Sequence, residues 1–324
     1  MAYIVTFTGN EGAGKSTILT NLACELADAG TTVGVLSTDL RWQQLPVLLA
    51  GAIIRKEMSL GELFSHDNLV GGFAEYPHCR NLFVAGPERG ASCIAHEPPD
   101  KQALERFVYM LSSTFDYVLI EANEVFFNQF SAVAVQMANA IINVTEATEL
   151  GMAYELSNYE LLSAFRKDIA PIDILNADDG DLNVQEAQKH CGHGFQHTLP
   201  YHKLVRRSSS RCMPVQVDSG ATGTTINAYR KKITAIANEI KEAAEIAAAE
   251  QRRRNEMAAR KAAKAKQAAK EKRAQQQGAM PPPQQAAIPP AQPRPRQAAM
   301  PPAQPRPKPP AVNKPVPQHT EQQG

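Results

Sequence analysis

The stretch "GNEGAGKST" at residues 9–17 decides the fold class of this chain. It matches the pattern G-x-x-x-x-G-K-[ST], which runs from Gly9 to Ser16. A β-branched run at 3–9 precedes it and a helical pattern follows, as a phosphate-binding loop requires. The glycines let backbone N–H groups curl around phosphates, Lys15 reaches the terminal phosphates, and Ser16 offers a hydroxyl to Mg²⁺. The stretch therefore predicts a nucleotide-phosphate site.

Short β-branched runs alternate with helical patterns through the first 235 residues, which is typical of βαβ units. We expect an α/β, doubly wound, mainly parallel sheet of about seven strands with helices on both faces. The expected strands are 3–9, 32–37, 81–86, 116–121, 140–145, 172–177 and 194–200. Helices are expected at 16–30, ended by Gly30, and at 101–113.

Three parts follow one another along the chain: a P-loop domain at 1–245, a basic Ala/Lys/Arg-rich helical arm at 246–277, and a Pro-rich low-complexity tail at 278–324. An apolar stripe begins at Ile226 and ends near Glu250, so the first part of this helix is expected to pack on the domain. Beyond it, residues 251–273 favour helix by composition, either as a projecting helix or as a helix-prone disordered arm.

The charge is divided unevenly along the chain. Residues 251–324 hold 15 Lys and Arg against 3 Asp and Glu, and residues 1–250 hold the remaining 19 against 30, so their net charges are +12 and −11. Residues 251–273 carry almost no bulky apolar side chain, so nonspecific nucleic acid or an acidic protein surface is preferred to lipid as a partner. A solvated tail that only aids solubility is the competing interpretation.

The segment 281–310 contains a proline-rich repeat, "AAIPPAQPRPRQ" followed by "AAMPPAQPRPKP". Proline at this density favours polyproline II, which serves as a spacer or as a ligand for a polyproline-binding partner. Five scattered cysteines without a C-x-x-C pair favour a reducing compartment. No signal peptide or membrane-spanning stretch is visible, so a cytoplasmic location is expected.

At this point the sequence resembles the MinD/ParA group of P-loop ATPases, including the CpaE and TadZ proteins. The resemblance covers about residues 1–240 and rests on motifs in order. These are "GNEGAGKST", "NLACELADAGTTVGVLSTDLR", "LFVAGPERG", "FDYVLIEAN", "IDILNADDG" and "LPYHKLVRRSSSRCMPV".

The resemblance implies ATP and Mg²⁺ as ligands and assigns residues to them. The phosphates would be held by Gly9, Asn10, Glu11, Gly12, Ala13, Gly14, Lys15, Ser16 and Thr17. Lys15 and Asp39 would be catalytic, with Asp39 ordering the attacking water, and Asn176 would contact the adenine. The metal would be held by Ser16, Asp39 and Glu121, where Glu121 replaces the family's Walker B aspartate.

The chain departs from the family inside the phosphate loop. Asn10 stands where the family has a signature lysine that crosses a nucleotide-sandwiched homodimer, and Glu11 replaces a glycine. Asn10 cannot supply that positive charge, and Glu11 is unfavourable beside a polyphosphate unless it is turned outward or paired. ATP binding is expected, whereas the lysine that would activate a dimer is missing.

Two other clusters invite a functional interpretation. In "HCGHGFQHTLPYH" at 190–202, Cys191 and His193 could hold Zn²⁺, but the spacing matches no standard site and a polar loop edge is preferred. In "EVFFNQF" at 124–130, the phenylalanines form either a nucleotide-sensitive partner surface or, preferably, core packing.

Two functions fit these observations. The first is a slow ATPase that positions, partitions or assembles a larger structure. The alternative is a nucleotide-gated scaffold that binds ATP with little hydrolysis and acts through its basic arm and proline repeats. A metabolic P-loop enzyme fits less well, because no added substrate domain is visible.

Overall fold

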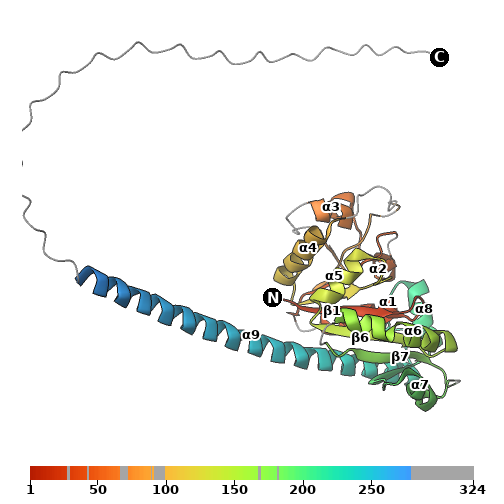
Figure 1. Cartoon of the computed structure of the whole chain (residues 1–324). Helices are drawn as coiled ribbons and strands as arrows, with labels where there is room; N and C mark the ends of the chain where they lie inside the picture. Colours follow the sequence, from red (N-terminus) through yellow and green to blue (C-terminus); the bar gives the residue numbers. More distant parts are fainter. Residues whose placement is uncertain are drawn as a thin grey trace, which may run out of the picture. The chain divides into compact units, whose positions relative to one another are not determined.

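The structure is a computed structural model that describes residues 1–27, 30–41, 44–65, 72–88, 90, 99–166, 169–180 and 182–278. The chain divides into two units, Met1–Ala259 and Arg260–Gly324. The fold set out below is that of the first unit (Figure 1).

Within the described residues, the strands form one sheet in the order β3-β4-β2-β5-β1-β6-β7-β8. Their bounds are β1 (Tyr3–Gly9), β2 (Val33–Ser37), β3 (Ala74–Glu75), β4 (Leu82–Val84), β5 (Tyr117–Glu121), β6 (Ala140–Glu146), β7 (Ile172–Asp178) and β8 (His197–Pro200). Every neighbouring pair is parallel except β3 with β4. The predicted mainly parallel sheet is confirmed, and its eighth member is the two-residue strand β3, which is too short to give a sequence pattern.

Helices alternate with these strands. Their bounds are α1 (Lys15–Leu26), α2 (Gln44–Leu48), α3 (Leu60–Ser65), α4 (Lys101–Thr114), α5 (Gln129–Met137), α6 (Glu149–Arg166), α7 (Val184–Cys191), α8 (Lys203–Arg211) and α9 (Thr224–Gly278), with a 3₁₀ turn at Lys56–Met58. The predicted helix at 101–113 matches α4. The predicted helix at 16–30 is shorter, because α1 ends at Leu26.

Helices cover both faces of the sheet, and β1 shows why. Its alternate residues point to opposite faces: Val5 and Phe7 join the core beneath α1, α2 and α9, whereas Ile4 joins the core beneath α3, α4 and α5. Both sets are buried, as a central strand covered on two sides requires.

Helix α9 changes character along its length. The predicted apolar stripe is confirmed, because its residues are buried in the same core cluster as the apolar side chains of α1. They are Ile226, Tyr229, Ile233, Ile236 and Ile240. The helix continues to Gly278, and the side chains of residues 251–269 are exposed. Of the two forms considered for the arm, the helical one is therefore found through residue 278.

No helix in the described part of the chain combines the length and the apolar character needed to cross a bilayer.

Candidate functional site

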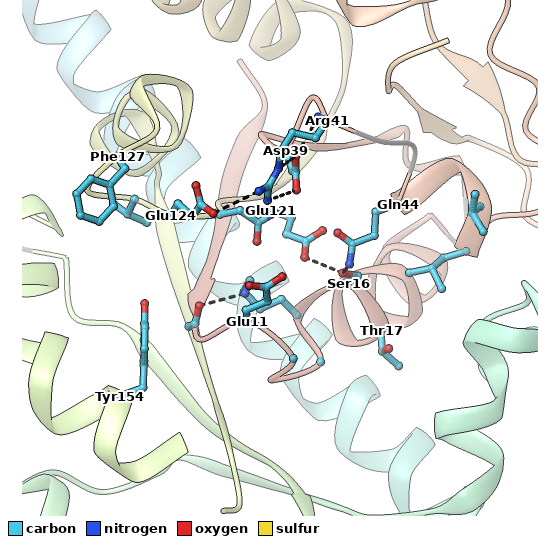
Figure 2. Close-up of a pocket in the computed structure, with 18 of the residues that line it drawn as sticks. Glu11, Ser16, Thr17, Asp39, Arg41, Gln44, Glu121, Glu124, Phe127 and Tyr154 are labelled. Atoms are coloured by element: carbon cyan, nitrogen blue, oxygen red, sulfur yellow. Dashed lines mark hydrogen bonds and ion pairs between the residues drawn. The ribbon is translucent and has the colours of Figure 1, made fainter. Parts of the chain in front are cut away.

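The phosphate loop borders a cavity of about 720 Å³ at the carboxyl ends of β1, β2 and β5 (Figure 2). This is the edge of a doubly wound sheet at which ligands bind, and the volume is typical of small-molecule sites. The described residues that line it are Gly9, Glu11, Gly12, Gly14, Lys15, Ser16, Thr17, Asp39, Arg41, Gln44, Val47, Leu48, Glu121, Asn123, Glu124, Val125, Phe126, Phe127, Tyr154, Asn158 and Ser210.

Two glycines fix the path of the loop. Gly9 has φ 133° and Gly14 has φ 89°. Residues with a side chain adopt such positive φ values only with backbone strain. A Cβ on Gly9 would collide with the carbonyl oxygen of Val144, and one on Gly14 would collide with the Asn176 amide nitrogen. Gly14 begins α1 without a capping side chain, so the N–H groups of the first turn are available to an anion.

Lys15 folds back onto the loop. Its Nζ donates to the carbonyl oxygens of Gly9 at 3.0 Å and of Asn10 at 2.8 Å. Burial lowers the pKa of Lys15, and the nearby carboxylates of Glu121 and Glu11 oppose this shift. The ammonium is therefore held inside the curve of the loop, where a phosphate would meet it.

Ser16 links two elements across the floor of the cavity. Its Oγ donates to Glu121 Oε1 at 2.6 Å and accepts from Gln44 Nε2 at 2.8 Å. Glu121 Oε2 is buried without a hydrogen-bond partner among the described residues. Burial raises the pKa of Glu121, while the bond from Ser16 and the charge of Lys15 oppose the rise. A hydroxyl beside an unpaired carboxylate oxygen suits a hard cation such as Mg²⁺.

Asp39, two residues after the end of β2, forms an ion pair with Arg41. Arg41 holds it with Nε at 2.9 Å from Oδ1 and Nη2 at 2.8 Å from Oδ2, and Arg41 Nη1 lies 3.6 Å from Glu124 Oε1. Asp39 also raises the pKa of Glu121 through its charge. The predicted metal ligands Ser16, Asp39 and Glu121 therefore lie together, but Asp39 is engaged by an arginine (Figure 2).

The cavity carries more negative than positive charge. Four carboxylates line it among the described residues, against the two cations Lys15 and Arg41. Sequence reasoning missed Arg41 and Gln44, although "STDLRWQQ" at 37–44 places both just after the Asp39 strand. The available signal was their distance of two and five residues from Asp39.

The other predicted phosphate and base residues take different places. Asn176 donates to the Ala13 carbonyl at 2.7 Å and is not among the described residues that line the cavity. It therefore contacts the backbone of the phosphate loop. Glu11 is exposed, as its charge requires, and the Asn10 amide donates to the Glu11 carbonyl at 3.0 Å. Gly12 and Thr17 line the cavity, whereas Asn10 and Ala13 do not.

A buried polar network adjoins the loop. Thr8 donates to Asn143 Oδ1 at 3.2 Å, and Asn143 Nδ2 donates to Glu155 Oε1 at 3.0 Å and Asp173 Oδ1 at 2.9 Å. His193 bridges the same carboxylates, with Nε2 3.2 Å from Glu155 and Nδ1 3.4 Å from Asp173. We call these five residues the polar seam.

The polar seam corrects the interpretation of 190–202 as a polar loop edge at one residue, His193. The His193 side chain is only 12% exposed, and its bond to Glu155 raises its pKa against the effect of burial. Burial also favours a higher pKa for Glu155, but hydrogen bonds, first from His193 and then from Asn143, outweigh it and lower that pKa. Cys191 instead contacts Met152 Sδ at 3.5 Å.

The phenylalanines of 124–130 differ in burial, and core packing is found for two of them. Phe130 is buried against Phe64 and Phe107, at centroid distances of 5.5 Å and 6.1 Å. Phe126 packs on Phe165 at 5.5 Å. Phe127 is 91% exposed at the rim of the cavity. Of these three, only Phe127 is available to a partner.

Solved structures share this fold. The ParA family ATPase of Chlorobium tepidum TLS has a TM-score of 0.61 at 16% identity, covering 73% of this chain and 99% of that one. The septum site-determining protein MinD of Pyrococcus horikoshii OT3, complexed with Mg-ADP, gives 0.62 at 19%, covering 76% and 98%. An aspartate-to-alanine variant of Cyanothece McdA, in complex with ATP, gives 0.57 at 15%, covering 75% and 96%. The chain thus has the P-loop NTPase fold of MinD and ParA proteins.

Sequence comparison is more specific. No curated protein sequence matches the chain. One family model does match, over residues 1–277, and its description is Methylmalonyl Co-A mutase-associated GTPase MeaB. Because this match covers most of the chain and includes the whole phosphate site, the chain belongs to the MeaB family.

Proposed function

We propose that this protein binds a nucleoside triphosphate with Mg²⁺ and hydrolyses it slowly, and that it acts in positioning, partitioning or assembling a larger structure. The observation that carries the proposal is the position of Lys15, whose ammonium lies inside the loop on the carbonyls of Gly9 and Asn10. The uncapped first turn of α1 faces the same cavity. Backbone donors and one buried cation together suit a polyphosphate.

Ser16 and Glu121 would hold the metal ion. Glu121 Oε2 is buried and unpaired, and a cation would supply the partner that the described residues do not. When bound, Mg²⁺ neutralises negative charge on the phosphates. Asp39 lies close enough to affect the pKa of Glu121, which supports a role near the same ion.

Arg41 would supply the positive charge that Asn10 lacks. It lines the cavity and is 57% exposed, so its guanidinium has room to move from Asp39 toward a phosphate. In that position it would stabilise the charge that develops on the transferring group, and its departure would release the Asp39 carboxylate to orient the attacking water. The two residues would then act together within one chain.

ATP is the first candidate nucleotide, because solved structures of this fold are complexed with Mg-ADP or ATP. GTP is the second, because the matched family is described as a GTPase. Asp179 is exposed three residues after Asn176, outside the described lining of the cavity. If the base lies there, its carboxylate would accept from the N–H groups of guanine, whereas adenine presents an acceptor. The finer resemblance to CpaE and TadZ remains a prediction.

A nucleotide-gated scaffold is the alternative function. Glu121 in place of aspartate and the absence of the signature lysine both favour binding with little hydrolysis. In that case the basic arm and the proline repeats would carry the output, and a homodimer would form without a lysine across its interface. Phe127, exposed at the cavity rim, is the described residue best placed to contact a second copy.

The decisive experiment measures steady-state turnover of ATP and GTP by the full chain, by Lys15→Ala and by Asp39→Ala. The hydrolase proposal expects both variants to lose most of the turnover, at least about a hundredfold for Lys15→Ala. Turnover of the unaltered chain at the level of Lys15→Ala, together with tight nucleotide binding, would leave only the scaffold. Asp179→Ala separates the nucleotides, because it should weaken GTP binding and leave ATP binding unchanged.

A further inference from the structure

Two cysteines far apart in the sequence meet on the side of α1. Cys24 lies on α1, and Cys79 lies in the turn between β3 and β4, 55 residues later. The Cys79 thiol lies 3.7 Å from the Cys24 backbone carbonyl oxygen, and both cysteines line the same small cavity. Both are reduced in the structure. The Cys79 thiol therefore lies against the backbone of Cys24.

A second cavity, of about 480 Å³, gives reagents access to this pair. The described residues that line it are Cys24, Glu25, Ala27, Gly30, Cys79, Arg80, Asn81, Gln216 and Val217. Cys24 is only 5% exposed, whereas Cys79 is partly exposed. The hydrogen bond with Cys79 and then burial raise the pKa of Cys24. Cys79 is thus the thiol that a reagent reaches first, and Cys24 is the one that resolves the product.

Tyr76 adds an independent observation at the same place. It is fully buried, and its hydroxyl has no hydrogen-bond partner among the described residues. Burial, followed by the charges of Cys24, Cys79 and Cys212, raises the pKa of Tyr76. A buried O–H donor without a partner would stabilise a thiolate formed within its reach.

We propose that Cys24 and Cys79 form a reversible dithiol–disulfide site. The oxidant is a small-molecule disulfide such as oxidised glutathione. The Cys79 thiolate attacks one sulfur of the oxidant and displaces one glutathione thiolate. The Cys24 thiolate then attacks the Cys79 sulfur of this mixed disulfide and displaces the second. The protein loses two electrons and two protons, and the oxidant becomes two thiols.

The proposed bond would join the ends of one functional segment. Residues 25–78 lie between the two cysteines and carry β2, Asp39, Arg41 and Gln44, which form one wall of the nucleotide cavity. A cross-link at its ends restricts how far this segment can move away from α1. The proposal depends only on the thiol geometry, so it stands or falls separately from nucleotide hydrolysis.

The test exposes the folded full chain to oxidised glutathione, blocks the remaining thiols, and maps peptides without reduction. We expect a single peptide pair joined through Cys24 and Cys79, a mass lower by two hydrogen atoms, and full reversal by a reducing agent. Cys79→Ser should form no such bond, whereas Cys191→Ser, which removes a buried thiol elsewhere, should behave like the unaltered chain.

Mapping the unaltered chain keeps the proposal falsifiable even where Cys79→Ser folds poorly. A stable mixed disulfide on Cys79 with Cys24 still reduced would overturn it. A bond from Cys79 to Cys212 would overturn it as well, because the contact with Cys24 would then not decide the pairing.

Discussion

Arg41 holds Asp39 through both carboxylate oxygens, with its own backbone N–H 2.9 Å from Oδ1 as a third contact. Asp39 is 7% exposed and Arg41 is 57% exposed, so the arginine covers the carboxylate from the solvent side. A bidentate pair of this kind is stronger than a neutral hydrogen bond. Any role of Asp39 toward a metal ion or water therefore depends on where Arg41 is.

The first prediction concerns this pair. Arg41→Ala should weaken triphosphate binding about tenfold or more, because a hydrogen bond to a charged group contributes about 1.5–3 kcal/mol and the cavity keeps its four carboxylates. Titration with a fluorescent triphosphate analogue measures this. The matched control is Arg211→Ala, since Arg211 is 53% exposed and pairs with Asp218 at 2.7 Å outside the cavity lining. Tighter binding by Arg41→Ala would mean that Arg41 only blocks the site.

The second prediction concerns Glu121 and Glu155, two buried carboxyl groups whose pKa values are shifted in opposite directions. The pKa of Glu121 is raised above its ordinary 4.5, so its stabilising effect is complete below that value and is lost as pH rises through the raised pKa. Glu121→Gln should therefore raise the thermal midpoint at pH 7 and have less effect near pH 4. The same variant should lose the Mg²⁺ dependence of nucleotide binding.

Glu155→Gln is the matched comparison and should act in the opposite direction. The pKa of Glu155 is lowered, so its stabilising effect is present above 4.5 and is lost as pH falls through the lowered pKa. The variant should lower the midpoint at pH 7. Thermal melts of both variants between pH 4 and 8 check the pair of signs, and two shifts of the same sign at pH 7 would contradict the assignment.

The third prediction tests the departure inside the loop. Asn10→Lys restores the charge that MinD and ParA relatives are expected to place across a dimer, and it should raise nucleotide-dependent dimerisation or turnover. Light scattering with and without triphosphate, alongside turnover, measures both. Asn10→Gln lengthens the same side chain without adding charge and serves as the control. No change in Asn10→Lys would mean that this chain does not use that interface.

The fourth prediction concerns the exposed part of α9. A chain ending at Glu250 lacks a tail of net charge +12 and should bind DNA less tightly, with a shallower dependence on salt. Filter binding across a salt series measures the slope, and liposome binding tests the lipid alternative in parallel. Equal slopes for the full and shortened chains would remove residues 251–324 as the DNA contact.

Much of the fold could be predicted because the phosphate loop and the apolar strands are local patterns. The run 3–9 is buried on both faces and reads as a central strand without any tertiary information. β3 could not be predicted, because two residues carry no period. The predicted helix ending at Gly30 is too long, because the backbone leaves the helix after Leu26.

The sequence predicted which residues line the candidate site better than it predicted which of them bind one another. Lys15, Ser16, Asp39 and Glu121 do converge, as the motif order indicates. That Arg41 would bind Asp39 depends on the turn after β2, which spacing alone does not define. Likewise, Asn143 is a polar residue in the apolar strand β6, and only the packed structure shows which carboxylates it serves.

The polar seam limits how this protein can change by substitution. Glu155 is fully buried and Asp173 is 4% exposed, so removing His193 would leave two carboxylates in the interior without the imidazole between them. Thr8, which ends the seam, is the residue directly before Gly9 of the phosphate loop. Substitutions at these five positions are therefore expected to occur together. Related chains should carry either all five polar residues or apolar residues in their place.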